Sequence, residues 1–238
     1  MVSIKVEFTN NIVSYVLCKM TNPFFKKIFK NIKSHHKPRR IARLIRNIYI
    51  DLKFGGFLGG DVETPYKHLG ANRTGNTDYS ALPFIFNNQI SHTDVLVDIG
   101  CGKGRVLNWW LLNYPNNKIY GIEINKLIAD KVSWRLRNFK NVHIICGSAV
   151  DNIPYDANIF YMFYPFKGKM VDDFKDRIFA TGGLNSTGKK IKILLYTQIT
   201  PTDFCGDARF KVTKVQMPKR FYNLFLIEVL SVKSILCR

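Results

Sequence analysis

A glycine-rich stretch between an apolar run and a helical pattern constrains this chain more than any other feature. Residues 95–107 read VLVDIGCGKGRVL, and Asp98 ends the apolar run. Glycines follow at alternate positions, namely Gly100, Gly102 and Gly104. Glycine lets the backbone turn sharply and approach a ligand closely at the amino terminus of a helix. A dinucleotide loop needs GxGxxG, and Arg105 stands where its third glycine would fall, so the pattern predicts a ligand-binding loop that disfavours a pyrophosphate.

Apolar runs and helical patterns alternate from residue 94 onward. Five runs predict buried strands, at residues 94–98, 118–124, 142–146, 158–164 and 190–199. Helical patterns separate most of them, with Asn125 as the N-cap of one helix and Gly182–Gly183 ending another. The tail predicts a hairpin, with strands at 209–217 and 222–232 on either side of Pro218. This order predicts an α/β fold, a mostly parallel sheet with helices on both faces and one antiparallel strand from the C-terminal hairpin.

The segment before the first strand is loop-like and rich in glycine. Residues 64–82 read TPYKHLGANRTGNTDYSAL. Thr77 is a candidate N-cap for a helix that begins near Asp78 and ends near the polar residues 87–89.

A second acid stands one strand further along. Glu123 ends the second predicted strand, and a carboxylate there can accept hydrogen bonds from both hydroxyls of a ribose. The third strand is followed by Gly147, Ser148 and Ala149, which are candidates to line an adenine. Ser148 or the later Asp151 could accept a hydrogen bond from the adenine amino group, although a loop serine is commonly a turn residue.

The sequence of motifs VDIGCGKG, GIEIN, CGSA and FYPF resembles class I S-adenosylmethionine-dependent methyltransferases over about residues 64–232. The resemblance implies a Rossmann-like methyltransferase fold with a seven-stranded sheet. It implies that the glycine loop holds the methionine part of the cofactor S-adenosyl-L-methionine and that Glu123 holds the ribose. The cofactor-binding residues implied in this way are Tyr66, Asp98, Gly100, Cys101, Gly102, Gly104, Glu123, Ile124, Ser148 and Ala149.

The fourth motif, Phe163–Tyr164–Pro165–Phe166, departs from the family pattern. Many relatives have Asn-Pro-Pro-Tyr there, and the Asn side chain and a following carbonyl orient a target amine toward the methyl group. Here Tyr164 takes the Asn position, which puts methylation of a nucleobase amine in doubt. The resemblance still implies that Tyr164, Pro165 and Phe166 line the pocket of the methyl acceptor as catalytic residues. They could equally be core aromatics at a strand end.

The amino-terminal part is unusually basic. Residues 1–60 hold twelve Lys or Arg against Glu7 and Asp51, and the whole chain of 238 residues has a net charge of +19. Two amphipathic helices are predicted there, over 23–37 and after Pro38. We therefore expect a basic helical extension over residues 1–60 and a methyltransferase domain over 61–238. The helices of residues 23–50 either pack on the domain or contact an anionic membrane surface or another polyanion.

Cysteine usage and hydropathy indicate where such a chain works. The five cysteines are widely spread and form no CxxC pair, so we expect neither a disulfide framework nor a metal site. No apolar stretch approaches the roughly 18 residues of a membrane span. We expect a cytoplasmic protein, with the basic segment as its candidate peripheral membrane contact.

Three functions are consistent with these features. The first is an active methyltransferase whose acceptor is unknown, with a saccharide or other cell-surface precursor, or a protein, as candidates. The second is an RNA methyltransferase, which the positive charge suggests, although no RNA-binding motif is present. The third is a catalytically inactive methyltransferase fold that serves as a binding or scaffold module, suggested by Tyr164 and Ser148.

Overall fold

The structure is a computed structural model that describes residues 38–230, and the chain divides into two compact units, Met1–Phe57 and Leu58–Arg238. The first unit contains helix α3 (Pro38–Lys53), which confirms the helix predicted after Pro38. The helix predicted over residues 23–37 lies outside the described residues. The expected role of residues 1–60 as a separate extension stays a prediction.

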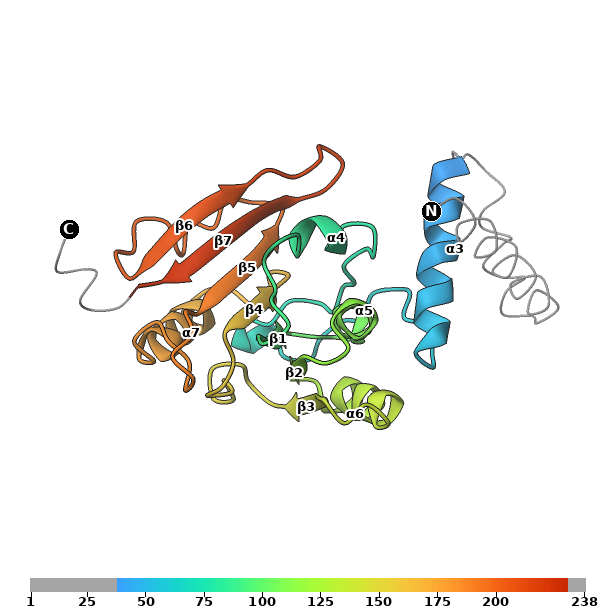
Figure 1. The fold of residues 1–238 in the computed structure, drawn as a ribbon, viewed down its shortest axis with the longest axis horizontal. Helices are drawn as coiled ribbons and strands as arrows, with labels where there is room; N and C mark the ends of the chain where they lie inside the picture. Colours follow the sequence, from blue (N-terminus) through green and yellow to red (C-terminus); the bar gives the residue numbers. More distant parts are fainter. Residues whose placement is uncertain (1–37, 231–238) are drawn as a thin grey trace. The chain divides into compact units, whose positions relative to one another are not determined.

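The second unit is built on one seven-stranded sheet with the strand order β3-β2-β1-β4-β5-β7-β6 (Figure 1). The strands are β1 (Val95–Ile99), β2 (Lys118–Glu123), β3 (Val142–Cys146), β4 (Ile159–Met162), β5 (Lys192–Thr197), β6 (Phe210–Val215) and β7 (Asn223–Val229). Every strand predicted from the sequence is present, with ends that differ by a few residues.

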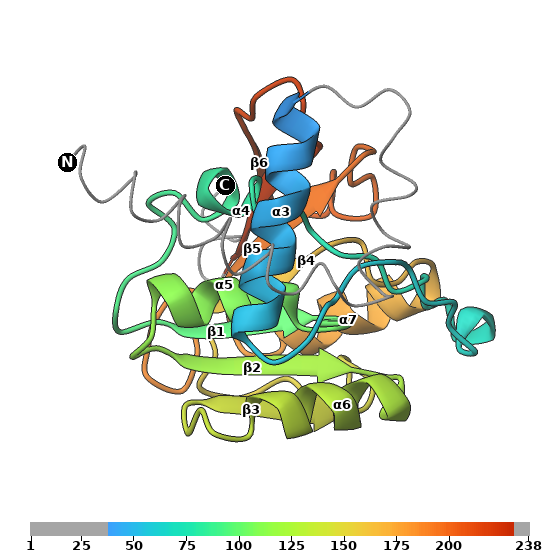
Figure 2. The ribbon, with the colours of Figure 1, turned by 90° about the vertical axis from the view of Figure 1, so that its right-hand side faces the viewer.

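The direction of the strands agrees with the prediction as well. Strands β1 to β5 pair in parallel, and β1, β2 and β3 lie side by side in Figure 2. Strand β7 runs antiparallel to both β5 and β6, as expected for a C-terminal hairpin whose second strand inserts beside β5. The sheet therefore confirms the predicted mostly parallel arrangement with one reversed strand.

Helices on the two sides of the sheet enclose the core. They are α4 (Leu82–Ile85), α5 (Arg105–Asn113), α6 (Lys126–Leu136) and α7 (Lys169–Phe179), together with the short 3₁₀ helix η1 (Lys67–Leu69). Helices α5 and α6 lie on one side of the sheet and α7 on the other. Because β-strand side chains alternate, Tyr161 of β4 contacts Phe86 beyond α4, with 5.4 Å between ring centroids, whereas Phe160 and Met162 join the core of α7.

Thr77 does not cap a helix, so that prediction is wrong. Its hydroxyl lies 2.7 Å from the hydroxyl of Tyr161, and both residues are buried. Helix α4 starts instead after Ala81, without a side-chain cap, and has only four residues. Burial of a polar side chain requires a partner, and Tyr161 supplies it. The periodicity of the sequence carries no information on such a long-range contact.

The predicted N-cap of α6 is confirmed. The side-chain oxygen of Asn125 accepts hydrogen bonds from the backbone N–H groups of Leu127 at 3.1 Å and Ile128 at 3.4 Å. The cap fixes the turn that follows Glu123 at the end of β2.

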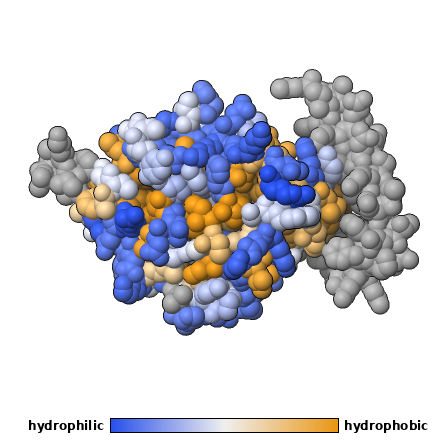
Figure 3. Space-filling model, turned by 90° about the horizontal axis from the view of Figure 1, so that it is seen from below, coloured by the Kyte–Doolittle hydropathy of each residue, from blue (hydrophilic) through white to orange (hydrophobic). Residues whose placement is uncertain are grey.

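Hydrophilic residues cover much of the face shown in Figure 3, and apolar residues gather toward its centre. Within residues 38–230, none of the helices combines the length and the apolar character needed to cross a membrane.

Candidate functional site

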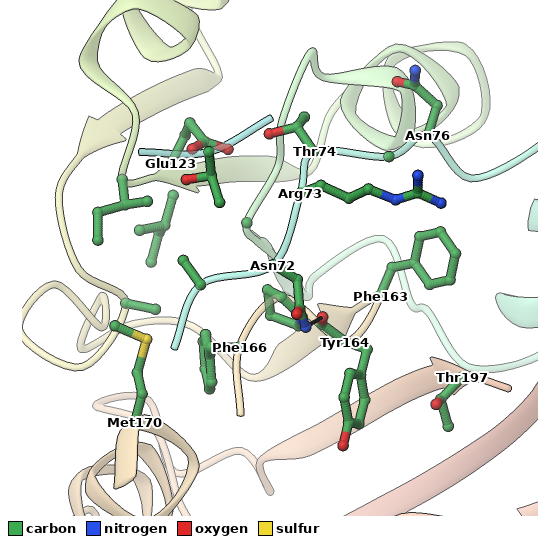
Figure 4. Close-up of a pocket in the computed structure, with 18 of the residues that line it drawn as sticks. Asn72, Arg73, Thr74, Asn76, Glu123, Phe163, Tyr164, Phe166, Met170 and Thr197 are labelled. Carbon is green, nitrogen blue, oxygen red and sulfur yellow. Dashed lines mark hydrogen bonds between the residues drawn. The ribbon is translucent and has the colours of Figure 1, made fainter. Parts of the chain in front are cut away.

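A cavity of about 520 Å³ opens at the carboxyl ends of the parallel strands. Its walls come from the loops that follow β1, β2, β3, β4 and β5, from residues 61–76, and from Tyr222 at the start of β7. Ligands of open α/β sheets bind at this edge, where the strand order reverses between β1 and β4. Glu123 lies at one end of the cavity, and Phe163, Tyr164 and Thr197 lie at the other (Figure 4).

Glu123 is nearly buried and lines the cavity. One carboxylate oxygen accepts a hydrogen bond from the backbone N–H of Gly102 at 2.9 Å, and the other accepts one from Asn125 at 2.8 Å. A carboxylate offers about four acceptor positions, so capacity for further donors remains. Burial raises the pKa of Glu123, whereas these backbone donors lower it. The hydrogen bond from Gly102 thus holds Glu123 beside the glycine loop, as the sequence pattern suggested.

Asp98, near the end of β1, is 3% exposed; it is not itself among the lining residues, but Gly100, two residues further along, is. Burial raises its pKa well above the usual range, and the negative charge of Glu123 raises it further. Among residues 38–230 its carboxylate has neither a hydrogen-bond donor nor an ion-pair partner. A buried carboxylate without a partner is costly, so this one is suited to a cation from outside the chain.

The glycine loop is packed on three sides by other parts of the chain. A Cβ atom on Gly100 would lie 2.7 Å from Cβ of Pro165, and one on Gly102 would lie 2.6 Å from Cγ2 of Thr74. Both glycines have positive φ, of 70° and 51°. Gly100 lines the cavity, whereas Gly102 and Gly104 do not. The alternate glycines therefore let the loop approach its neighbours in the chain as well as the cavity.

Cys101 points away from the cavity. Its side chain is buried, and its sulfur lies 2.9 Å from the position that a Cβ atom on Gly121 of β2 would take. Burial, and then the charge of Asp98, raise the pKa of its thiol well above the usual range. Cys101 is therefore a neutral packing residue, and its predicted contact with the cofactor would have to come from its backbone.

A buried polar network supports the loop from α5 and α6. Arg135 donates to the backbone carbonyl of Lys103 at 2.8 Å and to the side-chain oxygen of Asn108 at 2.7 Å. Asn108 in turn donates to the hydroxyl of Tyr79 at 3.0 Å. A Cβ atom on Gly104 would lie 2.9 Å from the same guanidinium group. Arg135 could not be predicted from the sequence, because an arginine within a helix gives no sequence signal for such a role.

The loop after β3 contributes Gly147, Ser148 and Ala149 to the cavity wall. The hydroxyl oxygen of Ser148 accepts a hydrogen bond from the backbone N–H of Val150 at 3.2 Å, which is the local turn bond expected of a loop serine. Asp151 is exposed and lies outside the cavity lining. Ile124, beside Glu123, completes this end of the cavity.

Residues 58–76 fold across the carboxyl edge of the sheet, which the sequence did not predict. Val62 and Thr74 form a β-bridge within this segment, and Ala71 forms one with Phe166. The ammonium group of Lys103 donates to the carbonyls of Gly59 at 2.8 Å and Gly60 at 2.7 Å. The segment is thereby attached to both the glycine loop and the fourth motif.

Asn72 donates hydrogen bonds to two consecutive backbone carbonyls of the fourth motif. Its side-chain amide donates to the carbonyl of Tyr164 at 2.7 Å, drawn as a dashed line in Figure 4, and its backbone N–H donates to the carbonyl of Pro165 at 2.9 Å. Tyr164 has φ of 46°, a left-handed conformation that is uncommon for a tyrosine. The contacts of Asn72 therefore hold a strained residue at the carboxyl end of β4.

Tyr164, Pro165 and Phe166 all line the cavity. The pKa of Tyr164 is raised by partial burial and by the charge of Asp203, so its phenol stays protonated at neutral pH. Phe166 also packs on Phe174 of α7, with 5.7 Å between ring centroids. It belongs to the core cluster as well as to the cavity wall.

Tyr66 lies outside the cavity lining. It is half-buried and precedes η1, and its backbone carbonyl accepts a hydrogen bond from Ala71. Its predicted closure over the cofactor stays a prediction. The residues of this segment that do line the cavity are Asp61, Thr64, Ala71, Asn72, Arg73, Thr74, Gly75 and Asn76.

Phe163 and Tyr222 line the far end of the cavity, and the buried ring of Tyr196 packs against both. Phe163, Tyr196 and Tyr222 lie with ring centroids 5.4 to 5.9 Å apart. Arg73 extends toward Phe163 in Figure 4, and its guanidinium lies 3.3 Å from the carboxylate of Asp61. Thr197, Gln198 and Ile199 after β5 complete this end. The sequence patterns did not single these residues out, although the positions of Phe163 after β4 and of Thr197 at the end of β5 are a usable signal.

The strand order, the glycine loop after β1 and the acid after β2 define the class I methyltransferase fold. A protein-family model described as "Putative methyltransferase" matches residues 92–163, which span β1 to the start of the fourth motif. The family match thus covers the part of the chain that contains Asp98, the glycine loop and Glu123.

Solved structures with the same fold are distant in sequence. A putative RNA methyltransferase from Pyrococcus horikoshii aligns with a TM-score of 0.51 at 16% identity, covering 78% of this chain and 96% of its own. A putative methyltransferase from Escherichia coli aligns with a TM-score of 0.50 at 15% identity, covering 74% and 96%. Comparison with curated protein sequences gives no significant match. These likenesses show the fold.

Within residues 38–230, no three His, Cys, Asp or Glu side chains are grouped so that they could hold a metal ion. The described cysteines, Cys101, Cys146 and Cys205, are free thiols.

Proposed function

We propose that this protein is an S-adenosyl-L-methionine-dependent methyltransferase. The observation that carries the proposal is the pair of nearly buried carboxylates, Asp98 and Glu123, on either side of a glycine loop at the carboxyl edge of a methyltransferase sheet. The family match over residues 92–163 supports the same reading.

The residues present fit the cofactor. The carboxyl group of Asp98, which has no partner within residues 38–230, suits the cationic amino group of the methionine part, and Glu123 retains acceptor capacity for ribose hydroxyls. Ile124, Ser148 and Ala149 provide a mostly apolar wall for an adenine. A cavity of about 520 Å³ lies within the range of small-molecule sites.

The chain itself contributes alignment and exclusion of water. When bound, the cofactor supplies an electrophilic methyl group on a sulfonium. Tyr164, Pro165 and Phe166 would line the acceptor side of the cavity. They would hold the attacking atom of the acceptor in line with the methyl group. The strained backbone of Tyr164 is fixed by Asn72, so the wall is preorganised before an acceptor enters.

The fourth motif disfavours an amine as acceptor. The carbonyls of Tyr164 and Pro165 already accept hydrogen bonds from Asn72, and a tyrosine replaces the asparagine side chain. We therefore propose that the methylated atom is not an amine held by these two carbonyls. A saccharide or other cell-surface precursor, a protein and RNA all remain acceptor proposals.

Incubation with S-adenosyl-L-methionine carrying a labelled methyl group, together with separate glycan, lipid, protein and RNA fractions, tests the proposal. We expect label in one fraction, and loss of that label in a Glu123→Gln variant that stays folded. A folded protein that binds the cofactor but labels no fraction would favour the scaffold function suggested by Tyr164.

A further inference from the structure

The tip of the β6–β7 hairpin carries a group of positive charges without negative partners. Lys214 lies near the end of β6, and Lys219 and Arg220 lie in the connection to β7. All three residues are exposed, and none of them forms an ion pair with any residue in the described part of the chain. Arg220 lies over the ring of Phe221, 4.8 Å from its centroid.

The cations nearer the other end of the same hairpin are paired, which makes the tip distinctive. Arg209 contacts Asp207 and Asp176, and Lys211 contacts Glu228 on the neighbouring strand at 3.3 Å. Glu228 is the only acid between residues 208 and 230. Positive charge is therefore neutralised at one end of the hairpin and concentrated at the other, where it attracts anions.

A second cavity, of about 500 Å³, lies at this tip. Lys214 and Lys219 line it, together with Gln216, Asn223, Phe221 and Tyr222. Val215, Met217 and Pro218 add apolar surface, and none of the lining residues in the described part of the chain is a carboxylate. Phosphate oxygens accept hydrogen bonds from ammonium and amide N–H groups. The faces of aromatic side chains can stack on a planar ring of a ligand.

Tyr222 belongs to both cavities. It is 39% exposed, its backbone N–H donates to the hydroxyl of Tyr196 at 3.1 Å, and its ring lies near those of Tyr196 and Phe163. The ring is thus held as a fixed wall between the acceptor end of the first cavity and the cationic tip. The two cavities therefore share Tyr222 as a wall residue, and a ligand that spanned both would lie against this ring.

We propose that the methyl acceptor carries a phosphate or diphosphate group, which binds Lys214 and Lys219 at the hairpin tip while its reacting end lies beyond Tyr222 in the first cavity. This inference rests on the proposed methyltransferase function, and it narrows the acceptor to a phosphorylated compound. The ring of Tyr222 would contact the part of the acceptor next to the phosphate.

Calorimetric titration of the full chain with inorganic pyrophosphate and with uridine diphosphate tests the inference. We expect both to bind, and uridine diphosphate to bind more tightly because its ring can stack on Tyr222. A Lys214→Ala/Lys219→Ala variant should lose affinity for both probes by about tenfold. A Tyr222→Ala variant should lose only the advantage of uridine diphosphate.

A variant with the same loss of charge elsewhere is the control. Lys131 on α6 and Lys140 before β3 are exposed lysines at the opposite edge of the sheet. If the Lys131→Ala/Lys140→Ala variant weakens binding as much as the tip variant does, or if neither probe binds, the inference is overturned.

If a single-stranded RNA oligonucleotide binds equally well to the tip variant and to the unaltered chain, RNA is excluded as the source of this phosphate.

Titration with S-adenosylhomocysteine in the same variants separates this inference from the proposed function. We expect unaltered affinity for S-adenosylhomocysteine in the Lys214→Ala/Lys219→Ala variant. Loss of pyrophosphate binding with retained cofactor binding is the supporting result. A chain that binds pyrophosphate at the tip but not S-adenosylhomocysteine would contradict the proposed function and leave a phosphate site alone.

Discussion

At the scale of single residues, the site depends on two carboxylates that the fold keeps close together and nearly out of water. Glu123 is compensated by two backbone donors, whereas Asp98 has no partner among the described side chains. The sequence predicted both residues from their position at the carboxyl ends of strands. It could not predict that Glu123 would accept hydrogen bonds from the backbone while Asp98 would have no partner within residues 38–230.

Replacement of Asp98 by Asn should stabilise the free protein and weaken cofactor binding. Because the pKa of Asp98 is raised in the folded chain, its contribution to stability is present below the ordinary carboxyl pKa of about 4 and is lost as pH rises through the raised value. We expect Asp98→Asn to raise the melting temperature at pH 8, with the gain shrinking toward pH 4. Affinity for S-adenosylhomocysteine should fall by at least about tenfold.

Thermal melts over that pH range and a titration at pH 8 measure both effects. A variant that is less stable than the parent at pH 8 but binds equally well would show that Asp98 is a structural residue.

Tyr164 provides a test of backbone strain. With φ of 46°, it should be replaced better by asparagine, which tolerates left-handed conformations, than by alanine. Both changes remove the aromatic ring, and asparagine and alanine differ in how well they tolerate positive φ. We expect Tyr164→Asn to be more stable than Tyr164→Ala by up to about 1 kcal/mol in denaturant unfolding. Equal stabilities would mean that Asn72 does not hold this residue in the left-handed conformation in solution.

At the scale of structural elements, the glycine loop is held from behind by α5 and α6 and from the side by residues 58–76. The loop itself could be read from the sequence, as could α6 from its Asn125 cap. The position of residues 58–76 could not, because it depends on contacts between residues distant in sequence, such as that of Asn72 with Tyr164. The helix predicted to start at Thr77 was wrong for the same reason. The hydroxyl of Thr77 hydrogen-bonds that of Tyr161, which is distant in sequence, instead of capping a helix.

Arg135 should be more important to the loop than its neighbour Arg137. Arg135→Met removes hydrogen bonds to Asn108 and to the Lys103 carbonyl and leaves these groups unsatisfied. We expect it to lower the free energy of unfolding by about 1–3 kcal/mol and to weaken binding of S-adenosylhomocysteine. Arg137→Met is the matched control, because that side chain is exposed and its only hydrogen bond and ring contact within residues 38–230 are with Trp134; its effect should stay within about 0.5 kcal/mol.

Denaturant unfolding and calorimetric titration of the two methionine variants measure these effects. Similar losses in both would contradict a supporting role of Arg135.

The contact between the glycine loop and the fourth motif can be tested with one methyl group. Gly100→Ala places a Cβ atom 2.7 Å from Pro165, whereas Gly188→Ala meets nothing within 4 Å. Both positions have similar positive φ, of 70° and 77°, so the backbone strain is matched. We expect Gly100→Ala to be destabilised more than Gly188→Ala by about 1–3 kcal/mol and to bind the cofactor less well. Equal melting temperatures would show that the two loops are not in contact.

At the scale of the whole molecule, the order of strands and motifs could be predicted because each depends on local patterns, namely apolar runs, caps and a turn. The composition of the acceptor end could not, because Phe163, Tyr196 and Tyr222 come together only when β7 inserts beside β5. Two of the positively charged parts of the chain have a proposed role. One is the basic part of residues 23–50, whose contact with anionic membranes stays a prediction, and the other is the hairpin tip.

Calorimetric titration of S-adenosyl-L-methionine and S-adenosylhomocysteine into the purified full chain, at moderate salt, tests the central claim most directly. We expect one-to-one binding of both compounds in the micromolar range, with clear weakening in Glu123→Gln and in Asp98→Asn. Absence of binding in a chain shown to be folded by its melting transition, or binding unaffected by both substitutions, would contradict the assignment of this cavity to the cofactor.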